Sequence, residues 1–379
     1  MTTPWIEIEQ YQDEENREGT DFSEYVWQAR FACQVVVLPH EEWVKLKWGF
    51  NASALFDETL ERQRLFLESQ YAIRNEFRTE NPEHRTLAFR YVNRPGEGLL
   101  LSVLSKIHAR TKEEAIENAS AFYRELKSTF PYDYTLKPAV SRDEFRQMSG
   151  WDILGENGDQ SNLFQIKRVE VPAISNQRSP LLQGLWQSGP RAHEQIWRSL
   201  AASPNPLLMN VSLRCTLLYE KELQKLSSTT HEISGVNDKL LNQKTLSAIK
   251  RWNEAYIERR LTPWRKFFYL RIHLVSPQKM DENLFRIIGT SLTLGDDKQP
   301  SPGYKVIVPK HDERLNWCKK LRNLDFIFSS SYLPIPRLAE VADLEEVFSV
   351  MRLPYSPPEN GLPGVNFANS RDIKENNEV

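Results

Sequence analysis

The residues most suited to chemistry in this chain are basic and aromatic side chains interleaved between positions 250 and 266. Guanidinium and ammonium groups bind phosphate, and aromatic rings stack on nucleic-acid bases. The pattern therefore indicates a nucleic-acid-binding face built from Lys250, Arg251, Arg259, Arg260, Arg265 and Lys266. An alternative stays open, because Trp252 and Tyr256 also fit the core stripe of a helix whose basic residues form its solvated face.

The sequence shows no pattern for a catalytic or metal site beside this stretch. A P-loop ends in glycine followed by lysine, and none of the 15 glycines precedes a lysine. The seven histidines are scattered, and neither Cys-x-x-Cys nor His-Glu-x-x-His occurs. A Gly-x-Ser-x-Gly nucleophile turn is missing as well. We therefore predict no catalytic residues, no metal, no cofactor and no enzymatic activity.

Length and composition predict a cytoplasmic globular protein with more than one folding unit. The 379 residues are enough for two or three domains. A formal charge of −2 excludes a uniformly basic nucleic-acid binder but is compatible with a local basic patch. Three widely spaced cysteines favour reduced thiols. We expect no membrane span and no signal peptide, and peripheral membrane association remains compatible with this composition.

Apolar periodicity and turn signals predict the elements that position these side chains. In the first half, strands are expected at 25–38, 86–92, 98–109 and 132–138, with a helix at 54–78. Two more helices are expected after capping boxes, in which a hydroxyl and a glutamate three residues later bind free backbone N–H groups. These boxes pair Thr111 with Glu114 and Ser141 with Glu144.

The second half repeats the alternation of strands and helices. Strands are expected at 162–171, 206–219, 264–276 and 304–308, and helices at 193–202, 239–260, 281–294 and 311–321. The order strand–helix–strand–strand–helix–strand occurs at 25–137 and, by this interpretation, again at 206–308. Such units place helices on one face of a mostly antiparallel sheet.

These elements predict an α+β (mixed α/β) fold with two ferredoxin-like sheet-plus-helix units. The expected organisation is a flexible acidic tail at 1–24, a first unit at 25–160, a second unit at 161–330, and a C-terminal helix with a proline-rich tail at 331–379. The first 24 residues are assigned to a tail because they are charged and have no apolar period.

The C-terminal stretch predicts a partner interface. Residues 337–351 are expected to form a helix with one apolar face, followed by a Leu-Pro step and a run rich in proline and glycine. We expect no further domain to cover this face, and an exposed apolar patch marks an interface. The predicted interface residues are Leu338, Val341, Leu344, Phe348, Met351, Leu353, Pro354 and Leu362. The alternative is that the helix folds back onto the core of its own chain.

Three stretches together resemble the N-terminal half of the HerA/FtsK-superfamily ATPases of conjugation and type IV secretion systems and their relatives in defence systems. The first is residues 86–139, from TLAFRYVNRPGEG to YTLKPA. The second is NPLLMNVSLRCTLLYEKEL with the later strand WRKFFYLRIHLVSP. The third combines LAEVA, MRLP and GLPG near the C-terminus, which are similar to the link that leads into the motor in that family.

The resemblance implies an accessory role without ATPase activity, because the P-loop of the family's motor domain has no counterpart in this sequence. By this resemblance, we expect a non-catalytic adaptor that docks to a separate P-loop ATPase motor subunit within a homo- or hetero-oligomer. The alternative function is a nucleic-acid-binding module that contacts DNA through the basic face around 250–266.

Overall fold

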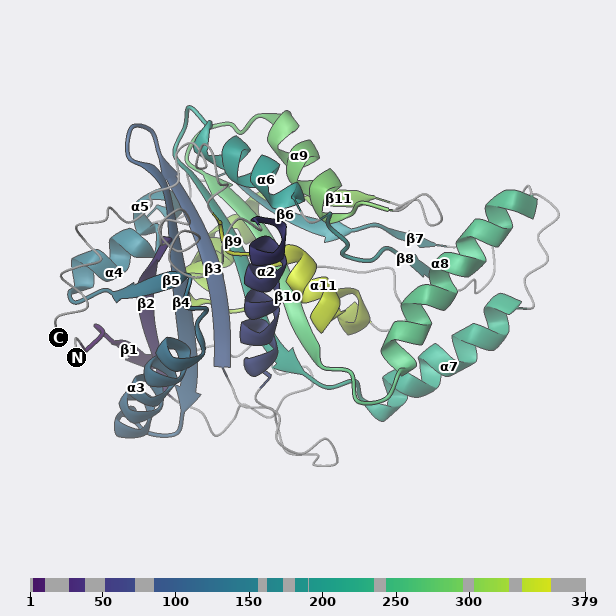
Figure 1. Ribbon diagram of the computed structural model, residues 1–379, viewed down its shortest axis with the longest axis horizontal. Helices are drawn as coiled ribbons and strands as arrows, with labels where there is room; N and C mark the ends of the chain where they lie inside the picture. Colours follow the sequence, from purple (N-terminus) through teal and green to yellow (C-terminus); the bar gives the residue numbers. More distant parts are fainter. Residues whose placement is uncertain are drawn as a thin grey trace.

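The computed structural model of the chain is shown in Figure 1. It describes residues 3–10, 27–37, 52–71, 85–155, 162–172, 181–189, 191–234, 243–295, 303–326 and 336–355. We refer to these as the described residues. Within them, one large antiparallel sheet has helices on both faces, which confirms the predicted α+β class. No helix in this part of the chain is both long and apolar enough to cross a membrane.

The first half of the sheet is a ferredoxin-like unit. Its elements are β2 (Trp27–Val37), α2 (Ala52–Ser69), β3 (Arg85–Arg94), β4 (Gly98–Ala109), α3 (Lys112–Thr129) and β5 (Tyr134–Pro138). The strands lie in the order β5-β2-β4-β3, and each neighbouring pair is antiparallel. This is the arrangement of a split β-α-β-β-α-β unit, in which the strand after each helix skips one position.

The second half repeats this order with different strands from those expected. Its elements are β6 (Asn162–Arg168), α6 (Ala192–Ala201), β9 (Leu207–Thr216), β10 (Phe267–Ser276), α9 (Glu282–Leu292) and β11 (Tyr304–Ile307). They form the order β9-β10-β6-β11, again antiparallel. The repeat therefore begins at β6, and the prediction that it spans 206–308 is wrong. A long segment separates β6 from α6, so the order of elements in the sequence did not indicate that β6 is the first strand of this unit.

The two units share one sheet because their equivalent strands pair with each other. β3 and β9, each the second strand of its unit, run antiparallel with Phe89 opposite Val211 and Arg90 opposite Asn210. The sheet therefore has the same strand order when followed inward from either end. A single apolar core runs across this junction, so the two predicted units are halves of one packed body.

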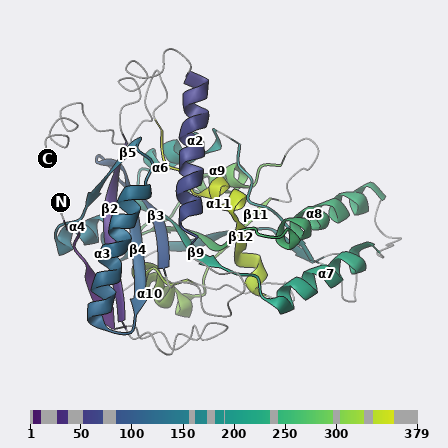
Figure 2. The ribbon, with the colours of Figure 1, turned by 60° about the horizontal axis from the view of Figure 1, so that its bottom comes forward.

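Helices cover both faces of this sheet (Figures 1 and 2). One face packs against α2, α3, α6, α9 and α11 (Leu344–Val350). The opposite face packs against α4 (Arg142–Met148), α5 (Trp151–Leu154) and α10 (Arg314–Asn323), which follows the short 3-10 turn η1 (His311–Glu313). Only one covered face was predicted. The second needs cover because strand residues such as Leu163, Leu208 and Val275 are apolar on that side too.

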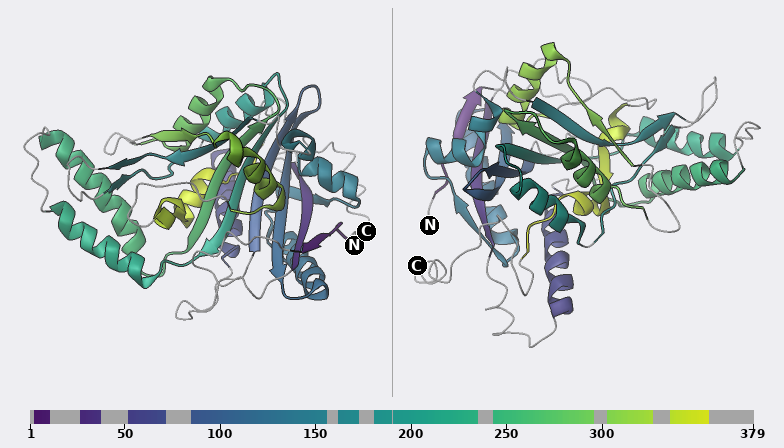
Figure 3. Two further views of the ribbon diagram at one scale, coloured as in Figure 1. Left: turned by 180° about the vertical axis from the view of Figure 1, so that it is seen from behind. Right: turned by 90° about the horizontal axis from the view of Figure 1, so that it is seen from above.

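Buried charge lies between α10 and the second face of the sheet, which is the face turned toward the viewer in Figure 3 (left). Arg90 of β3 is fully buried and donates to the carbonyl oxygens of Ser149 and Leu321, both at 2.7 Å. Lys106 of β4 forms a buried ion pair with Asp325, directly after α10. The carbonyl groups at a helix C-terminus carry partial negative charge, so cations on the sheet stabilise this end of α10.

A helical hairpin projects from the second unit, to the right in Figure 1. It consists of α7 (Glu220–Ser234) and α8 (Gln243–Leu261), inserted between β9 and β10, and we call it the arm. The small hairpin of β7 (Glu170–Pro172) and β8 (Leu181–Gln183) lies beside it, and β8 contacts α8. The helix expected at 239–260 corresponds to α8, whereas α7 was not predicted.

Two predictions made from local sequence signals, the helix caps and the N-terminal tail, had different outcomes. Both predicted caps are present, because Thr111 Oγ1 accepts from the N–H of Glu114 at 3.1 Å and Ser141 Oγ from that of Glu144 at 3.2 Å. The tail prediction is wrong for residues 3–10, which include β1 (Glu7–Gln10) paired with β2. The rest of the predicted tail lies outside the described residues. Strand pairing supplies the order that the charged sequence did not indicate.

Candidate functional site

The C-terminal segment, residues 336–355, lies on the sheet of its own chain. It begins with the 3-10 turn η2 (Pro336–Glu340), continues as β12 (Val341–Asp343), and ends with α11. β12 pairs antiparallel with β10, placing Val341 opposite Tyr269 and Asp343 opposite Phe267. The single helix predicted for 337–351 is therefore a 3-10 turn, a short strand and a short helix.

The predicted partner interface is buried within the chain. Leu338, Val341, Leu344, Met351 and Leu353 are each at most 8% exposed, Pro354 is buried, and Phe348 is half-buried. Leu362 lies outside the described residues. The expectation of an exposed apolar patch is wrong here, and the alternative that the segment folds back is correct. The apolar face packs against the sheet and α2 of its own chain, because burial next to the existing core removes it from water.

A fully buried glutamate anchors this segment. Glu346 of α11 forms ion pairs with Arg168 of β6 and, at 2.7 Å, with Arg260 of α8. It also accepts from the backbone N–H of Trp186 at 3.2 Å. Burial alone would raise the pKa of Glu346, but the two guanidinium groups outweigh it and hold that pKa below its ordinary value. The carboxylate is therefore charged and matched by two buried cations.

Asp343 makes a second anchor one turn earlier. Its carboxylate binds Arg259 through two hydrogen bonds of 2.7 and 2.5 Å and Arg265 through one of 2.9 Å. It also caps α11, accepting from the N–H of Glu346 at 3.0 Å, while Glu346 accepts from the N–H of Asp343. Burial opposes ionisation, but the contact with Arg259 lowers the pKa of Asp343. The C-terminal segment is thus tied by charge to the base of the arm.

Most of the predicted nucleic-acid face is used in these internal contacts. Arg259 and Arg265 bind Asp343, Arg260 is fully buried against Glu346, and Lys266 pairs with Glu68 of α2 at 2.7 Å. Of the remaining two residues, Arg251 is exposed and Lys250 is half-buried. The prediction of one continuous basic surface is therefore wrong, because acidic residues distant in sequence meet the arginines at the end of α8.

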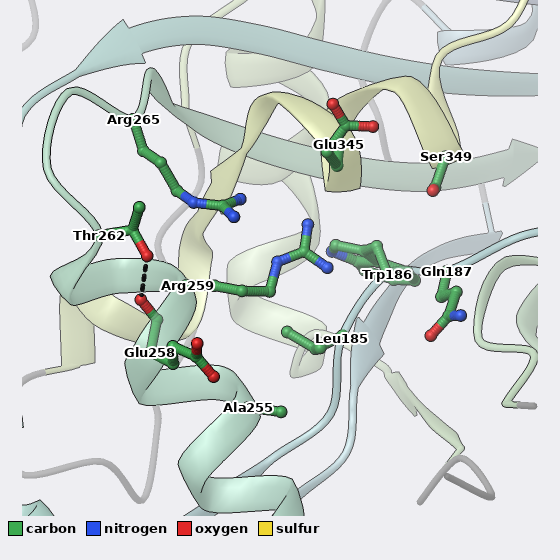
Figure 4. Close-up of a pocket in the computed structure, with 10 residues that line it drawn as sticks. All are labelled: Leu185, Trp186, Gln187, Ala255, Glu258, Arg259, Thr262, Arg265, Glu345 and Ser349. Carbon is green, nitrogen blue, oxygen red and sulfur yellow. Dashed lines mark hydrogen bonds between the residues drawn. The ribbon is translucent and has the colours of Figure 1, made fainter. Parts of the chain in front are cut away.

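A pocket of about 480 Å³ opens between the end of α8 and α11 (Figure 4), and we call it the arm-base pocket. It is lined by Leu185, Trp186, Gln187, Ala255, Glu258, Arg259, Thr262, Arg265, Glu345 and Ser349. Arg259 of α8 and Arg265, which follows α8, extend toward α11, and Glu345 pairs with Arg64 of α2 at 2.9 Å. The charged side chains of the arm-base pocket are therefore largely paired within the chain. Such a pocket suits hydrogen bonding to neutral polar groups such as a peptide backbone.

Trp264 stands beside this pocket, between the lining residues Thr262 and Arg265 in sequence. Its side chain is 70% exposed, and its backbone φ of 65° is left-handed, a region that bulky residues avoid. The exposed Tyr219 and Leu223 are at the start of α7, which is the same end of the arm. A strained backbone that presents a large aromatic ring to solvent is typical of a binding position.

The residues of the candidate site that sequence reasoning missed are Asp343, Glu346 and Trp264. Asp343 and Glu346 are spaced like a capping box, so that pattern could have indicated a helix start at Leu344. Trp264 is one of the aromatic residues of the stretch 250–266, and no local sequence signal indicates that it is exposed. No group of three or more histidine, cysteine or acidic side chains in the described part of the chain is arranged to hold a metal ion.

Two comparisons of this chain with known sequences found no match. No protein-family model matches it, and no curated protein is significantly similar to it. The family resemblance of these three stretches therefore stays a proposal.

Two buried histidines beside these elements make stability depend on pH. His193 of α6 donates from Nε2 to the carbonyl oxygen of Val350 at 3.1 Å, and His273 lies in β10 against Trp317. Burial, helped by Arg352 for His193 and by Arg271 for His273, lowers the pKa of each imidazole to about 3. Both are therefore neutral in the folded protein at neutral pH.

We expect the free energy of unfolding to fall as the pH is lowered from about 6.5 toward 3. Between these pH values the two imidazoles are protonated in the unfolded chain but stay neutral while buried in the folded protein. Each histidine therefore contributes up to about 1.4 kcal/mol per pH unit to the fall in the free energy of unfolding. In His273→Leu, the slope of the free energy of unfolding against pH should correspond to about one bound proton fewer between pH 6.5 and 4.5, as measured by urea unfolding. An unchanged slope in this variant would show that His273 titrates normally in the folded state.

Proposed function

We propose that this protein is a non-catalytic adaptor that docks to a P-loop ATPase motor subunit of the HerA/FtsK type in the cytoplasm. The class of partner comes from the resemblance of the strand–helix modules and of the LAEVA and MRLP stretches. The docking surface we assign to it is the arm-base pocket together with Trp264. This replaces the apolar face of the C-terminal segment, which is buried.

The assignment of this surface rests on the exposure and the backbone conformation of Trp264. A tryptophan that is 70% exposed in a left-handed backbone conformation costs conformational energy and leaves apolar area in water. Tryptophan is also among the residues that contribute most to protein–protein binding. The adjacent pocket of about 480 Å³ has polar walls that a partner's backbone could bind, so an anchor and a polar rim lie together.

The anchoring of the C-terminal segment supports the same surface. In the resemblance, this segment corresponds to the link that precedes the motor domain. Here it is tied to the arm through Asp343 and Glu346, so Glu345 and Ser349 of α11 form one wall of the pocket while α8 forms the other. A partner seated in the pocket would contact the arm and the C-terminal segment at once.

Replacing Trp264 with alanine is expected to weaken docking at least tenfold, because loss of a central aromatic anchor costs about 2 kcal/mol or more. The measurement is co-purification, then titration, of the chain with a HerA/FtsK-type ATPase encoded in the same genome. Leu315→Ala is the matched control, since Leu315 is an exposed apolar residue of α10 on the other side of the sheet.

Two results would contradict parts of the proposal separately. Equal affinity of wild type and Trp264→Ala would exclude this surface while leaving the adaptor function in place. Absence of any complex with such an ATPase would exclude the partner class. We do not propose the nucleic-acid-binding alternative at residues 250–266, because four of its six basic residues are bound to acidic side chains within the chain.

A further inference from the structure

The ion pairs at the base of the arm contain more arginines than carboxylates. Asp343 pairs with two arginines, at 2.5 and 2.9 Å, and Glu346 pairs with two others. The four arginines are Arg168, Arg259, Arg260 and Arg265. Within the described part of the chain, no third carboxylate forms an ion pair with any of them. Four guanidinium groups therefore meet two carboxylates, which leaves an excess of two positive charges.

Two of these four arginines reach the arm-base pocket. The side chains of Arg259 and Arg265 are 22% and 34% exposed and line the pocket, whereas those of Arg168 and Arg260 are at most 1% exposed. Figure 4 shows the guanidinium groups of Arg259 and Arg265 in the space between α8 and α11. The part of the excess charge that a ligand can contact is therefore at this pocket.

Arg265 uses little of its hydrogen-bonding capacity within the chain. A guanidinium group has five N–H donors. Arg265 donates once to the described residues, from Nη1 to Oδ2 of Asp343 at 2.9 Å, and its Nε has no acceptor among them. Arg259, in contrast, is held by two hydrogen bonds to the same carboxylate. Arg265 can therefore bind a second carboxylate while Asp343 stays in place.

The two acidic residues that line the pocket offset only part of this charge. Glu345 already pairs with Arg64 of α2 at 2.9 Å. Glu258 is exposed and forms no ion pair with the described residues, so solvent and salt screen its charge, and it offsets at most one of the two excess positive charges. Trp264, which is 70% exposed, precedes Arg265 directly in the sequence. A cationic pocket and a large apolar ring thus lie together on the docking surface.

We propose that the docking surface binds an acidic segment of the partner, with an aspartate or glutamate side chain in the arm-base pocket and a neighbouring apolar residue on Trp264. Charge complementarity is the basis, because a carboxylate in the pocket would bind Arg265 and balance arginines that the acids of this chain leave in excess. This inference rests on the proposed docking function and adds the chemistry of the partner's segment.

The test is calorimetric titration of the full chain, at low ionic strength, with the capped peptide acetyl-Leu-Glu-Leu-Glu-Leu-amide and with its glutamine counterpart. We expect the glutamate peptide to bind saturably and at least tenfold more tightly than the glutamine peptide, because charge-assisted hydrogen bonds are stronger than neutral ones. Arg265→Gln should remove this preference, and Arg251→Gln should change it less than twofold. Arg251 is the matched control because it is an exposed arginine of α8 that does not line the pocket.

A second variant applies if thermal unfolding shows that Arg265→Gln does not fold. Glu258→Gln removes an exposed acidic group from the pocket, so it should tighten binding of the glutamate peptide about twofold or more and leave binding of the glutamine peptide unchanged. Its exposed side chain makes a loss of folding unexpected.

Three results would overturn the acidic-segment proposal. They are equal binding of the two peptides to the wild type, no saturable binding of the glutamate peptide, and an unchanged preference in folded Arg265→Gln or, where that variant does not fold, in Glu258→Gln. Docking to the ATPase that depends on Trp264 would be unaffected by any of these results. The failure of this inference and the failure of the proposed function are therefore distinguishable.

Discussion

Glu346→Gln is expected to lower the free energy of unfolding by about 3–5 kcal/mol, the usual cost of breaking a buried ion pair from one side. The substitution keeps the size of the side chain but removes its charge. Arg168 and Arg260, both fully buried, would then have no carboxylate to match them. The loss should be visible as a lower midpoint in urea unfolding with an unchanged slope.

The neighbouring residue supplies the control for this prediction. Glu345 belongs to the same turn of α11, but it is half-exposed and pairs with Arg64 at the surface. Glu345→Gln should change stability by no more than about 1 kcal/mol, as for other exposed ion pairs. Similar losses in the two variants would show that burial of Glu346 between two arginines is not what stabilises the segment.

The same ion pairs predict how stability responds to acid. The folded-state pKa of Glu346 lies below its ordinary value of 4.5. Its contribution is therefore complete above pH 4.5 and is lost as the pH falls through the lower folded-state pKa. Glu346→Gln should remove this part of the acid dependence, which lies below pH 4.5.

Lys106→Met is expected to destabilise the protein by a similar amount, about 3–5 kcal/mol, from the opposite face of the sheet. Lys106 and Asp325 form an ion pair in which both side chains are at most 7% exposed. Methionine fills the volume of the lysine stem but leaves the Asp325 carboxylate buried without its cation. The end of α10, which this pair holds to β4, should unfold first, as measured by amide hydrogen exchange.

A double variant separates charge from packing at this position. In Lys106→Met with Asp325→Leu, both charges are replaced by apolar side chains, and such replacements are often neutral or stabilising. We expect the double variant to regain most of the stability lost in the single variant. A double variant as unstable as Lys106→Met would show that the loss comes from side-chain packing and not from the unmatched carboxylate.

Buried charge thus has a similar role on both faces of the sheet. On one face it ties the C-terminal segment to the arm, and on the other it ties α10 to the central strands. In both places arginines or lysines of the sheet and arm meet acids or carbonyl groups from a later part of the chain. Such contacts specify where a segment docks, because an alternative position leaves several buried charges unmatched.

Much of the fold was predictable from the sequence because its signals are local. The caps at Thr111 and Ser141 depend on residues three positions apart, and strand periodicity depends on the next few neighbours. These signals determined the α+β class and the ferredoxin-like order of the first unit. The second unit was assigned the wrong first strand, since β6 and α6 are separated by a segment that carries no regular period.

The candidate site was predicted less well because it depends on contacts between distant residues. Apolar residues such as Val341, Leu344 and Met351 occur equally in exposed interfaces and in buried cores. Arginines such as Arg259 and Arg260 can form either a phosphate-binding surface or internal ion pairs. Which applies is decided by partners distant in the sequence, as in the pairing of Arg260 with Glu346, 86 positions away.

By itself, the sequence determined the class of the fold, the start of its best-capped helices and the lack of any recognised catalytic motif. Tertiary structure alone decided that the C-terminal segment is internal, that the arginines of α8 hold it, and that Trp264 is exposed. The physical reason is that hydrogen-bonded periodicity and capping act within a few residues, whereas burial and charge matching are properties of surfaces brought together only by folding.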